Sequence, residues 1–313
     1  MATRRIDSQL EAVSAKWGKK HSRTITCAAN TADALDGLYL PINYFTPNLV
    51  EVNGYVWFNG AGAGTDPAPS GKTLIGSVSV TGGSETAAQV AAALKTTLDA
   101  AVVSGSIKAF MTSTVSGSGV TVENHFIGEI TAETDADSTG CTFATVTSGM
   151  GLDLGGFTDG AELSFETNVT PIKSNQTGEI VGSEIYQGAS ASISMNLTEL
   201  TKARLVALIG EVTGASVTPS GGTAVVGYGE SKLFQALDEL GGQLILHPIR
   251  LASTDYSADW IFWKSAPKAS SINFDGTSQQ AMATEFVAYL DQAIQTEVNL
   301  FMHGDWTQDR FEA

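Results

Sequence analysis

The chain has 313 residues and a net charge of -16, and 42% of its residues are hydrophobic. That length suffices for two domains of roughly 100–200 residues each, and the hydrophobic content excludes wholesale disorder. The charge is uneven: residues 1–21 carry +3, residues 22–151 carry -7 and residues 152–313 carry -12. Domains this acidic exclude DNA binding by phosphate neutralisation, which needs clustered lysine and arginine. The acidity either keeps the protein soluble or repels DNA that passes close by.

No segment of the sequence has the pattern of a membrane span or an export signal. No apolar run approaches the roughly 18–20 residues that a span needs, and no apolar stretch follows the basic N-terminal residues. We therefore expect assembly in a cytoplasm. Cys27 and Cys141 form no CxxC motif, which excludes the common zinc and dithiol redox motifs. We expect free buried thiols, although the two cysteines could also meet on neighbouring strands.

Residues 1–21 are polar and basic and are expected to form an N-terminal arm. Within them, residues 7–17 have apolar side chains at helical spacing, Leu10, Val13 and Trp17, which predicts a short helix.

The sequence predicts an α+β accessory domain over residues 22–151. Strands are expected at 49–59 and 74–81, where β-branched and aromatic residues concentrate. Ser84 is expected to cap a helix of roughly seventeen residues. Four apolar residues share one face of that helix at helical spacing: Val90, Leu94, Leu98 and Ala101. The other elements expected are a hairpin over 109–123, a strand at 143–146 and a Gly-rich linker at 149–156.

Residues 152–313 show strict alternation of apolar and polar side chains, which is typical of half-buried antiparallel strands. The clearest cases are residues 161–168, 188–197 and 282–291. Their polar positions include Glu162, Ser164, Glu166, Ser190, Ser192, Ser194 and Glu285. The pattern predicts a mainly β chain whose last domain is an antiparallel β-sandwich or barrel.

One helix is expected to flank this sheet. It would begin at Asn196, because Glu199 follows at the spacing of a capping box. Further strands are expected at 243–246, 260–264 and 271–274.

No catalytic or cofactor-binding constellation emerges from the sequence. Gly71-Lys72-Thr73 matches the end of a phosphate-binding loop, but Asp66 stands where that loop needs glycine, and a strand follows instead of a helix. His303 and Asp305 are expected in an exposed polar turn, since the histidines lack metal-ligand spacing. We therefore expect a protein that is not an enzyme and that needs no metal or cofactor.

Two further clusters have a structural and a functional interpretation. The carboxylates Glu129, Glu133, Asp135 and Asp137 are expected in a solvated acidic turn, because their spacing does not match a calcium-binding loop. The aromatic residues at 260–263 are expected to pack in the core on one face and to form an interface on the other.

The last domain carries three characteristic runs: GFTDGAELSFETNVTPIKSNQTGEIV, GASASISMNLTELTKARLVALIG and MATEFVAYLD. They give, in order, a strand, a long loop, a strand running into a helix, and a closing strand. In these runs, residues 152–313 resemble the major tail tube proteins of long-tailed bacteriophages. Residues 22–151 resemble an accessory module of phage structural proteins. The resemblance rests on the runs YVWFNGAGAGTDPAPSGKT and SETAAQVAAALKTTLDAAV.

The resemblance implies homohexameric rings that stack into a tail tube in the virion. DNA would pass through the tube without specific binding, and the partners would be further copies of the chain and other tail proteins. The polar positions Glu162, Ser164, Glu166, Ser190, Ser192, Ser194 and Glu285 would then face the lumen. The accessory domain would lie on the outside of the tube.

A polar stretch at 169–187 is longer than ordinary hairpin loops and is expected to contact the adjacent ring. The residues expected to make that contact are Lys173, Asn175, Gln176 and Glu179. The alternative function is a virion decoration or receptor-binding protein with the aromatic segment at 260–263 as its contact surface.

Overall fold

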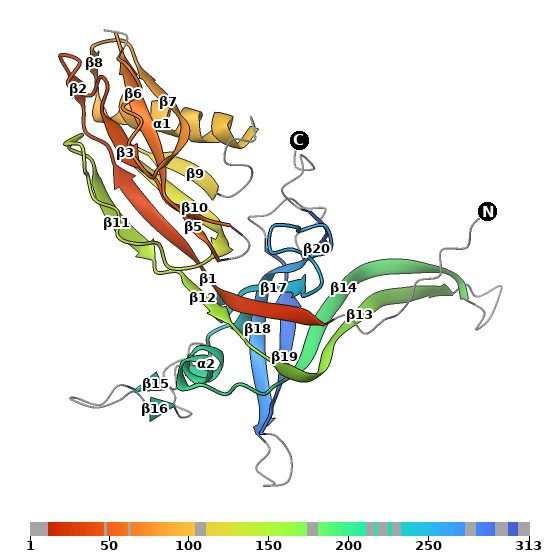
Figure 1. Ribbon diagram of the computed structural model, residues 1–313. Coiled ribbons are helices and arrows are strands. Elements are labelled where there is room, and N and C mark those ends of the chain that lie inside the picture. The colour runs from red at the N-terminus through yellow and green to blue at the C-terminus, as the bar shows by residue number, and fades with distance from the viewer. Residues whose placement is uncertain are drawn as a thin grey trace, which may run out of the picture. The chain divides into compact units, whose positions relative to one another are not determined.

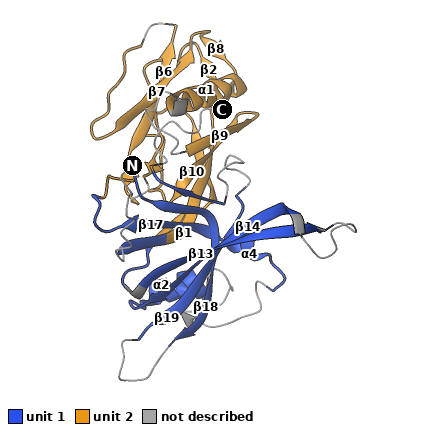
Figure 2. Cartoon of the chain, turned by 90° about the vertical axis from the view of Figure 1, so that its right-hand side faces the viewer, with its two compact units in different colours: residues 1–16, 153–252, 257–304 blue, residues 17–152, 253–256, 305–313 orange. Residues whose placement is uncertain are grey.

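The computed structural model describes residues 12–46, 49–61, 64–103, 111–173, 181–210, 216–217, 225–226, 233–272, 280–291 and 300–305. The chain is mainly β, with a large antiparallel sheet and few helices, which confirms the predicted fold class. It divides into two compact units (Figure 2). Unit 1 comprises residues 1–16, 153–252 and 257–304, and unit 2 comprises residues 17–152, 253–256 and 305–313. The sequence-based domains, 22–151 and 152–313, stay a prediction about independent folding.

Unit 1 is built on antiparallel strands in the order β13-β14-β19-β18-β17 (Figure 1). β20 pairs with the start of β18, and the first residues of β1 lie beside β17, where the Ile249 N–H donates to the Ala12 carbonyl at 2.8 Å. The bounds are β13 (Phe157–Lys173), β14 (Val181–Leu197), β17 (Gly242–Pro248), β18 (Trp260–Ile272), β19 (Met282–Tyr289), β20 (Phe301–His303) and β1 (Val13–Thr26).

The alternation seen in the sequence corresponds to burial on one face of this sheet. Ile193 of β14 and Phe286 of β19 lie directly opposite each other and are fully buried, and Met195 is buried on the same face. Successive residues of a strand point to opposite faces, so burying this set leaves the intervening residues on the other side.

The short elements of unit 1 are α2 (Lys202–Leu205), the π-helical turn η1 (Val206–Gly210), α4 (Leu237–Leu240), β15 (Ser216–Val217) and β16 (Val225–Val226). The predicted helix start at Asn196 is wrong, because Asn196 still belongs to β14. Thr201 is the N-cap, with its side chain accepting from the Arg204 N–H at 3.3 Å. Glu199 instead pairs with the Arg204 guanidinium at 2.7 Å.

Unit 2 has one antiparallel sheet in the order β11-β1-β10-β9 and a second sheet in the order β3-β6-β7. Helix α1 packs against β7 and β9 (Figure 1). The bounds are β2 (Asn30–Thr31), β3 (Tyr39–Pro41), β4 (Tyr44–Phe45), β5 (Glu51–Val52), β6 (Gly54–Gly60), β7 (Thr73–Val80), β8 (Ser84–Glu85), α1 (Ala87–Val103), β9 (Met111–Ser116), β10 (Gly119–Ile127), β11 (Thr142–Thr147) and β12 (Met150–Asp153).

The apolar face predicted for the helix of unit 2 is confirmed. Its four members, Val90, Leu94, Leu98 and Ala101, are buried in one cluster with Phe58 and Val78. The N-cap is Thr86 and not Ser84, which lies in β8. Thr86 and Gln89 form a reciprocal capping box: the Gln89 N–H donates to Thr86 Oγ1 at 3.4 Å, and the Thr86 N–H donates to Gln89 Oε1 at 2.8 Å.

Three expectations about the first strand and the linker are wrong. The described part of the predicted 7–17 helix is strand, since β1 starts at Val13. Residues 13–21 are therefore part of a sheet instead of a basic arm, and Ala15 and Trp17 are fully buried. The predicted linker at 149–156 is not irregular throughout, because it contains β12, although the two units divide inside it, between residues 152 and 153. Pairing with distant strands determines the structure of all three segments. The local spacing of apolar residues predicts structure only weakly where tertiary contacts favour another conformation.

Candidate functional site

The exposed face of the unit 1 sheet gathers the residues that the sequence predicted to share one surface. The pairs between β13 and β14 are Glu162–Ser194, Ser164–Ser192 and Glu166–Ser190, and Glu285 of β19 lies opposite Ser194. Six of these seven side chains are exposed, and Ser192 is half-buried. We call this set the polar face. That it lines a lumen stays a prediction.

The polar face is charged as well as hydrophilic. Glu162, Glu166 and Glu285 place three carboxylates on it. Lys268 of β18 lies opposite Glu285 and is exposed, so one ammonium group stands at its border. Lys268 was not predicted from the sequence, because the strand was expected to end at residue 264, whereas β18 continues to Ile272. The surface is therefore net negative and repels polyanions.

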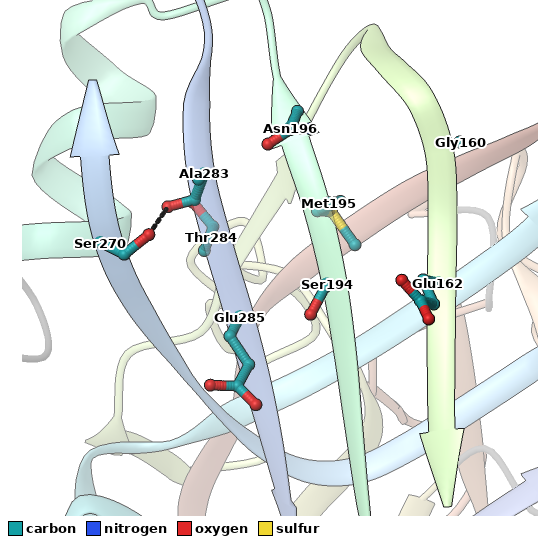
Figure 3. A pocket seen from close by; sticks show the side chains of 9 residues that line it. All are labelled: Gly160, Glu162, Ser194, Met195, Asn196, Ser270, Ala283, Thr284 and Glu285. Carbon is teal, nitrogen blue, oxygen red and sulfur yellow. Dashed lines mark hydrogen bonds between the residues drawn. The ribbon is translucent and has the colours of Figure 1, made fainter. Parts of the chain in front are cut away.

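A shallow hollow of about 200 Å³ opens on the polar face (Figure 3). Glu162, Ser194 and Glu285 reach it from three neighbouring strands, and the Ser270 hydroxyl on its rim donates to the Ala283 carbonyl at 3.2 Å. The residues that line it include no histidine, lysine or cysteine. The hollow therefore offers hydrated polar surface and lacks a nucleophile activated by a histidine base.

The β13–β14 hairpin extends beyond the end of β19, the strand that pairs with β14. β14 pairs with β19 only from Ser192 onward, so residues 165–173 and 181–191 form a two-stranded extension, which we call the arm (Figure 2). Its exposed apolar side chains are Phe165, Val169, Ile172, Ile185 and Tyr186. Val169 and Tyr186 lie directly opposite each other, at 42% and 64% exposure.

Part of the arm falls where the sequence predicted a loop. Residues 169–173 and 181–187 are strand, so the prediction of a loop over 169–187 is wrong there. Lys173 is the last residue of β13, and Asn175, Gln176 and Glu179 lie outside the described residues. A ribbon whose two faces are both exposed needs no alternation of polar and apolar residues. The sequence of these residues therefore lacks the alternation by which a strand is predicted.

The aromatic segment at 260–263 is mostly interior. Phe262 and Trp263 are buried, and Trp260 packs with its ring centroid 4.3 Å from that of His303. His303 is exposed, as expected, but it lies at the end of β20 instead of in a turn. Phe165 at the base of the arm reaches the same cluster, 5.0 Å from Phe301.

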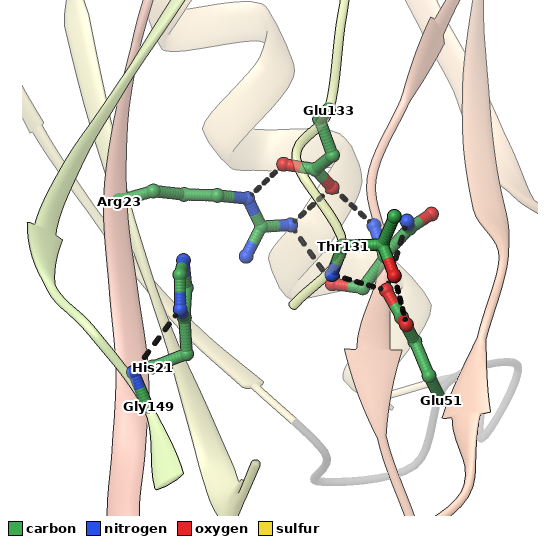
Figure 4. A network of polar contacts seen from close by, with 7 residues as sticks. His21, Arg23, Glu51, Thr131, Glu133 and Gly149 are labelled. Carbon is green, nitrogen blue, oxygen red and sulfur yellow. Dashed lines mark hydrogen bonds and ion pairs between the residues drawn. The ribbon is translucent and has the colours of Figure 1, made fainter. Parts of the chain in front are cut away.

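The acidic cluster of unit 2 is partly buried instead of a solvated turn (Figure 4). The Glu133 and Arg23 side chains are 1% and 3% exposed and form an ion pair, and Arg23 Nη2 donates to Glu133 Oε1 at 2.8 Å. The same guanidinium group donates to the Asn43 carbonyl at 2.9 Å. Glu51 accepts from the Thr131 N–H and hydroxyl at 2.9 and 2.7 Å. These contacts tie a long irregular segment to β1 and the strands beside it.

Other carboxylates of that cluster also bind backbone. Asp135 accepts from the N–H groups of Thr139 and Gly140 at 2.9 and 2.7 Å, and Asp137 accepts from the Tyr39 N–H at 2.9 Å. Backbone hydrogen bonds use the lone pairs that a metal ion would need. Among the described residues, no group of three or more His, Cys, Asp or Glu side chains is placed to hold a metal.

No helix in the described part of the chain is both long and apolar enough to cross a bilayer. A scan of protein-family models finds no match to this sequence, and a search of curated proteins also finds none. The geometry of the polar face and the arm therefore carries the functional argument.

Proposed function

We propose that the chain is a structural subunit that assembles with copies of itself into rings stacked as the tube of a phage tail. The observation that carries this proposal is the β13–β14 hairpin, which presents a hydrated acidic face at its base and exposed apolar side chains along its arm. The first suits a bore through which DNA slides, and the second suits contact between subunits.

The polar face supports the bore. A channel that passes DNA without gripping it needs hydrated side chains and a negative or neutral surface, because clustered cations would hold the phosphates. Serine and glutamate alternate across β13 and β14, and Lys268 at the border lies opposite the carboxylate of Glu285.

The arm supports assembly. A two-stranded ribbon is only marginally stable in water on its own. The arm exposes apolar side chains on both faces, Val169 with Tyr186 on one and Ile172 with Ile185 on the other, and exposed apolar side chains of this kind suit an interaction site. Within the described strands, β13 pairs only with β14, so a strand of 17 residues has one open edge. Open edges invite pairing with another chain, and closure into a ring removes them.

The virion decoration alternative finds less support. Its contact surface would be the aromatic segment at 260–263, but Phe262 and Trp263 are buried inside unit 1. Five exposed apolar residues lie on the arm instead, which favours contact with another subunit.

The proposal is tested by purifying the full chain and measuring its assembly state by light scattering and negative-stain electron microscopy over a range of concentrations. Hexameric rings or hollow tubes are expected. A monomer that persists at all concentrations, with no rings or tubes, would contradict self-assembly as the function.

A further inference from the structure

The two cysteines of unit 2 lie opposite each other at the end of a strand pair. The pairing of β1 with β11 ends at Thr26–Thr142, so Cys27 and Cys141 are the next two residues in register. One step further, Gly140 lies against Ala28: a Cβ built on the glycine would stand 3.2 Å from the Ala28 Cβ. The two segments therefore stay side by side past the cysteines, although β1 ends at Thr26 and β11 begins at Thr142.

The backbone hydrogen bonds show which kind of pair the two cysteines form. The Cys27 N–H donates to the Ser118 carbonyl at 2.9 Å, toward β10 and away from Cys141. In an antiparallel sheet, the N–H and C=O of one residue point to the same neighbour, so Cys27 and Cys141 form a non-hydrogen-bonded pair. Such pairs have Cα atoms about 4.5 Å apart, inside the range of roughly 4.4–6.8 Å that a disulfide spans.

The thiols are free, buried and in contact with each other. Both belong to the apolar cluster of unit 2, at 4% and 3% exposure. The Cys27 thiol donates a hydrogen bond to the Cys141 sulfur, which lowers the pKa of Cys141 to about 6, and the Ala28 N–H adds a second donor. The same contact, together with burial, raises the pKa of Cys27. Of the two, Cys141 is therefore the thiol that ionises more readily, and the thiolate is the form that reacts with an oxidant.

We propose that Cys27 and Cys141 are a latent disulfide, open in a reducing compartment and closed by a small oxidant such as hydrogen peroxide. The Cys141 thiolate attacks one peroxide oxygen, which gives a sulfenic acid and releases hydroxide. Cys27 then loses its proton and attacks that sulfur, which forms the S–S bond and releases a second hydroxide that the proton neutralises. One peroxide is thereby reduced to one water and one hydroxide ion, and the hydroxide takes a proton from the solvent to give a second water.

Because Cys27 and Cys141 are only 4% and 3% exposed, a small oxidant reaches them through local opening of the strand pair. The bond would close a loop of about 114 residues. Closing that loop lowers the conformational entropy of the unfolded chain and so stabilises the folded state. A chain that moves from a reducing to an oxidising compartment would thus gain a covalent link across unit 2, whatever its function.

The test is to treat the native full chain with hydrogen peroxide, block the remaining thiols under denaturing conditions, and map the peptides without reduction. We expect loss of both thiols, a peptide joining Cys27 to Cys141, and a rise of roughly 10 °C in the Tm of unit 2 that a reductant reverses. Free thiols on both residues after treatment, or separate oxidation to sulfinic acids without a cross-link, would overturn the proposal.

Single variants sharpen the result. With Cys27→Ala, Cys141 should stop at the sulfenic acid and react with dimedone, because the resolving thiol is gone. With Cys141→Ala, Cys27 should stay a thiol under the same treatment. Both variants are first compared with the parent by circular dichroism, and if one of them misfolds, the peptide map of the parent chain still decides.

Discussion

Unit 2 and the arm of unit 1 use the same kinds of residues in opposite ways. In unit 2, apolar side chains close around α1, and even the charged pair Arg23–Glu133 is buried and hydrogen-bonded. In the arm, apolar side chains such as Ile185 and Tyr186 face solvent. The first region buries its own apolar and charged groups, whereas the second leaves apolar groups exposed, which the proposed function assigns to contact with another subunit. A stability experiment should therefore report on unit 2, and an assembly experiment should report on the arm.

The largest effect on stability is expected from Glu133→Ala. Removing the carboxylate leaves the Arg23 guanidinium buried without its counter-charge, which destabilises folded proteins by about 3–5 kcal/mol. Urea denaturation followed by circular dichroism measures the loss. Glu129→Ala is the matched control, because Glu129 is exposed and its loss should change the free energy of unfolding by less than about 0.5 kcal/mol. Equal stability of the two variants would show that the buried pair contributes little.

A smaller, pH-dependent effect is expected from His21. Burial first, and then the Arg23 charge, lower the pKa of this imidazole. Its Nδ1 accepts from the Gly149 N–H at 3.3 Å, which requires the neutral form. A depressed folded pKa means that this stability is complete above about pH 6.5 and is lost as the pH falls toward the folded value.

The expected slope for one such group is at most about 1.4 kcal/mol per pH unit below pH 6.5. It is measured as the difference between the parent chain and His21→Asn, whose amide oxygen can accept in place of Nδ1. Parallel stability curves for the two proteins between pH 6.5 and pH 5 would contradict the assignment.

The smallest effect on folding, and the sharpest contrast, is expected from Ile185→Ser in the arm. Ile185 is 53% exposed, so the free energy of unfolding of the monomer should change by less than about 0.5 kcal/mol. Assembly should be lost, because an apolar contact between subunits is replaced by a hydroxyl group. Ile249→Ser, at 61% exposure and outside the arm, is the control and should still assemble. If both variants assemble like the parent chain, the arm is not an interface.

Sequence patterns predicted best those elements that have one buried face. The strands around Ile193 and Phe286 and the helix around Leu94 were predicted because burial of one side imposes a period on the residues. β1 was missed because the spacing of Leu10, Val13 and Trp17 also fits a helix, and only pairing with distant strands decides between the two.

The misses at the candidate site have equally physical causes. The outer part of the arm, residues 169–172 and 183–187, shows no period because both its faces are exposed. The burial of Glu133 depends on Arg23, a partner 110 residues away, and no local pattern encodes such a contact. The polar face itself was predicted as a set of residues, since alternation specifies which residues share a side of a strand. The alternation does not specify whether the polar face borders bulk solvent, a lumen or another subunit.

The central claim, that the polar face lines the bore of an assembled tube, is tested most directly by labelling. Ser190→Cys places an exposed thiol on the polar face, and Thr147→Cys places one on exposed β11 of unit 2. Each variant is labelled with maleimide gold before assembly and imaged by electron microscopy, with the unsubstituted chain as the blank for the buried native thiols. Gold from Ser190→Cys should lie on the tube axis, and gold from Thr147→Cys should lie away from it. Gold from Ser190→Cys on the outer wall, or a chain that never forms tubes, would contradict the account.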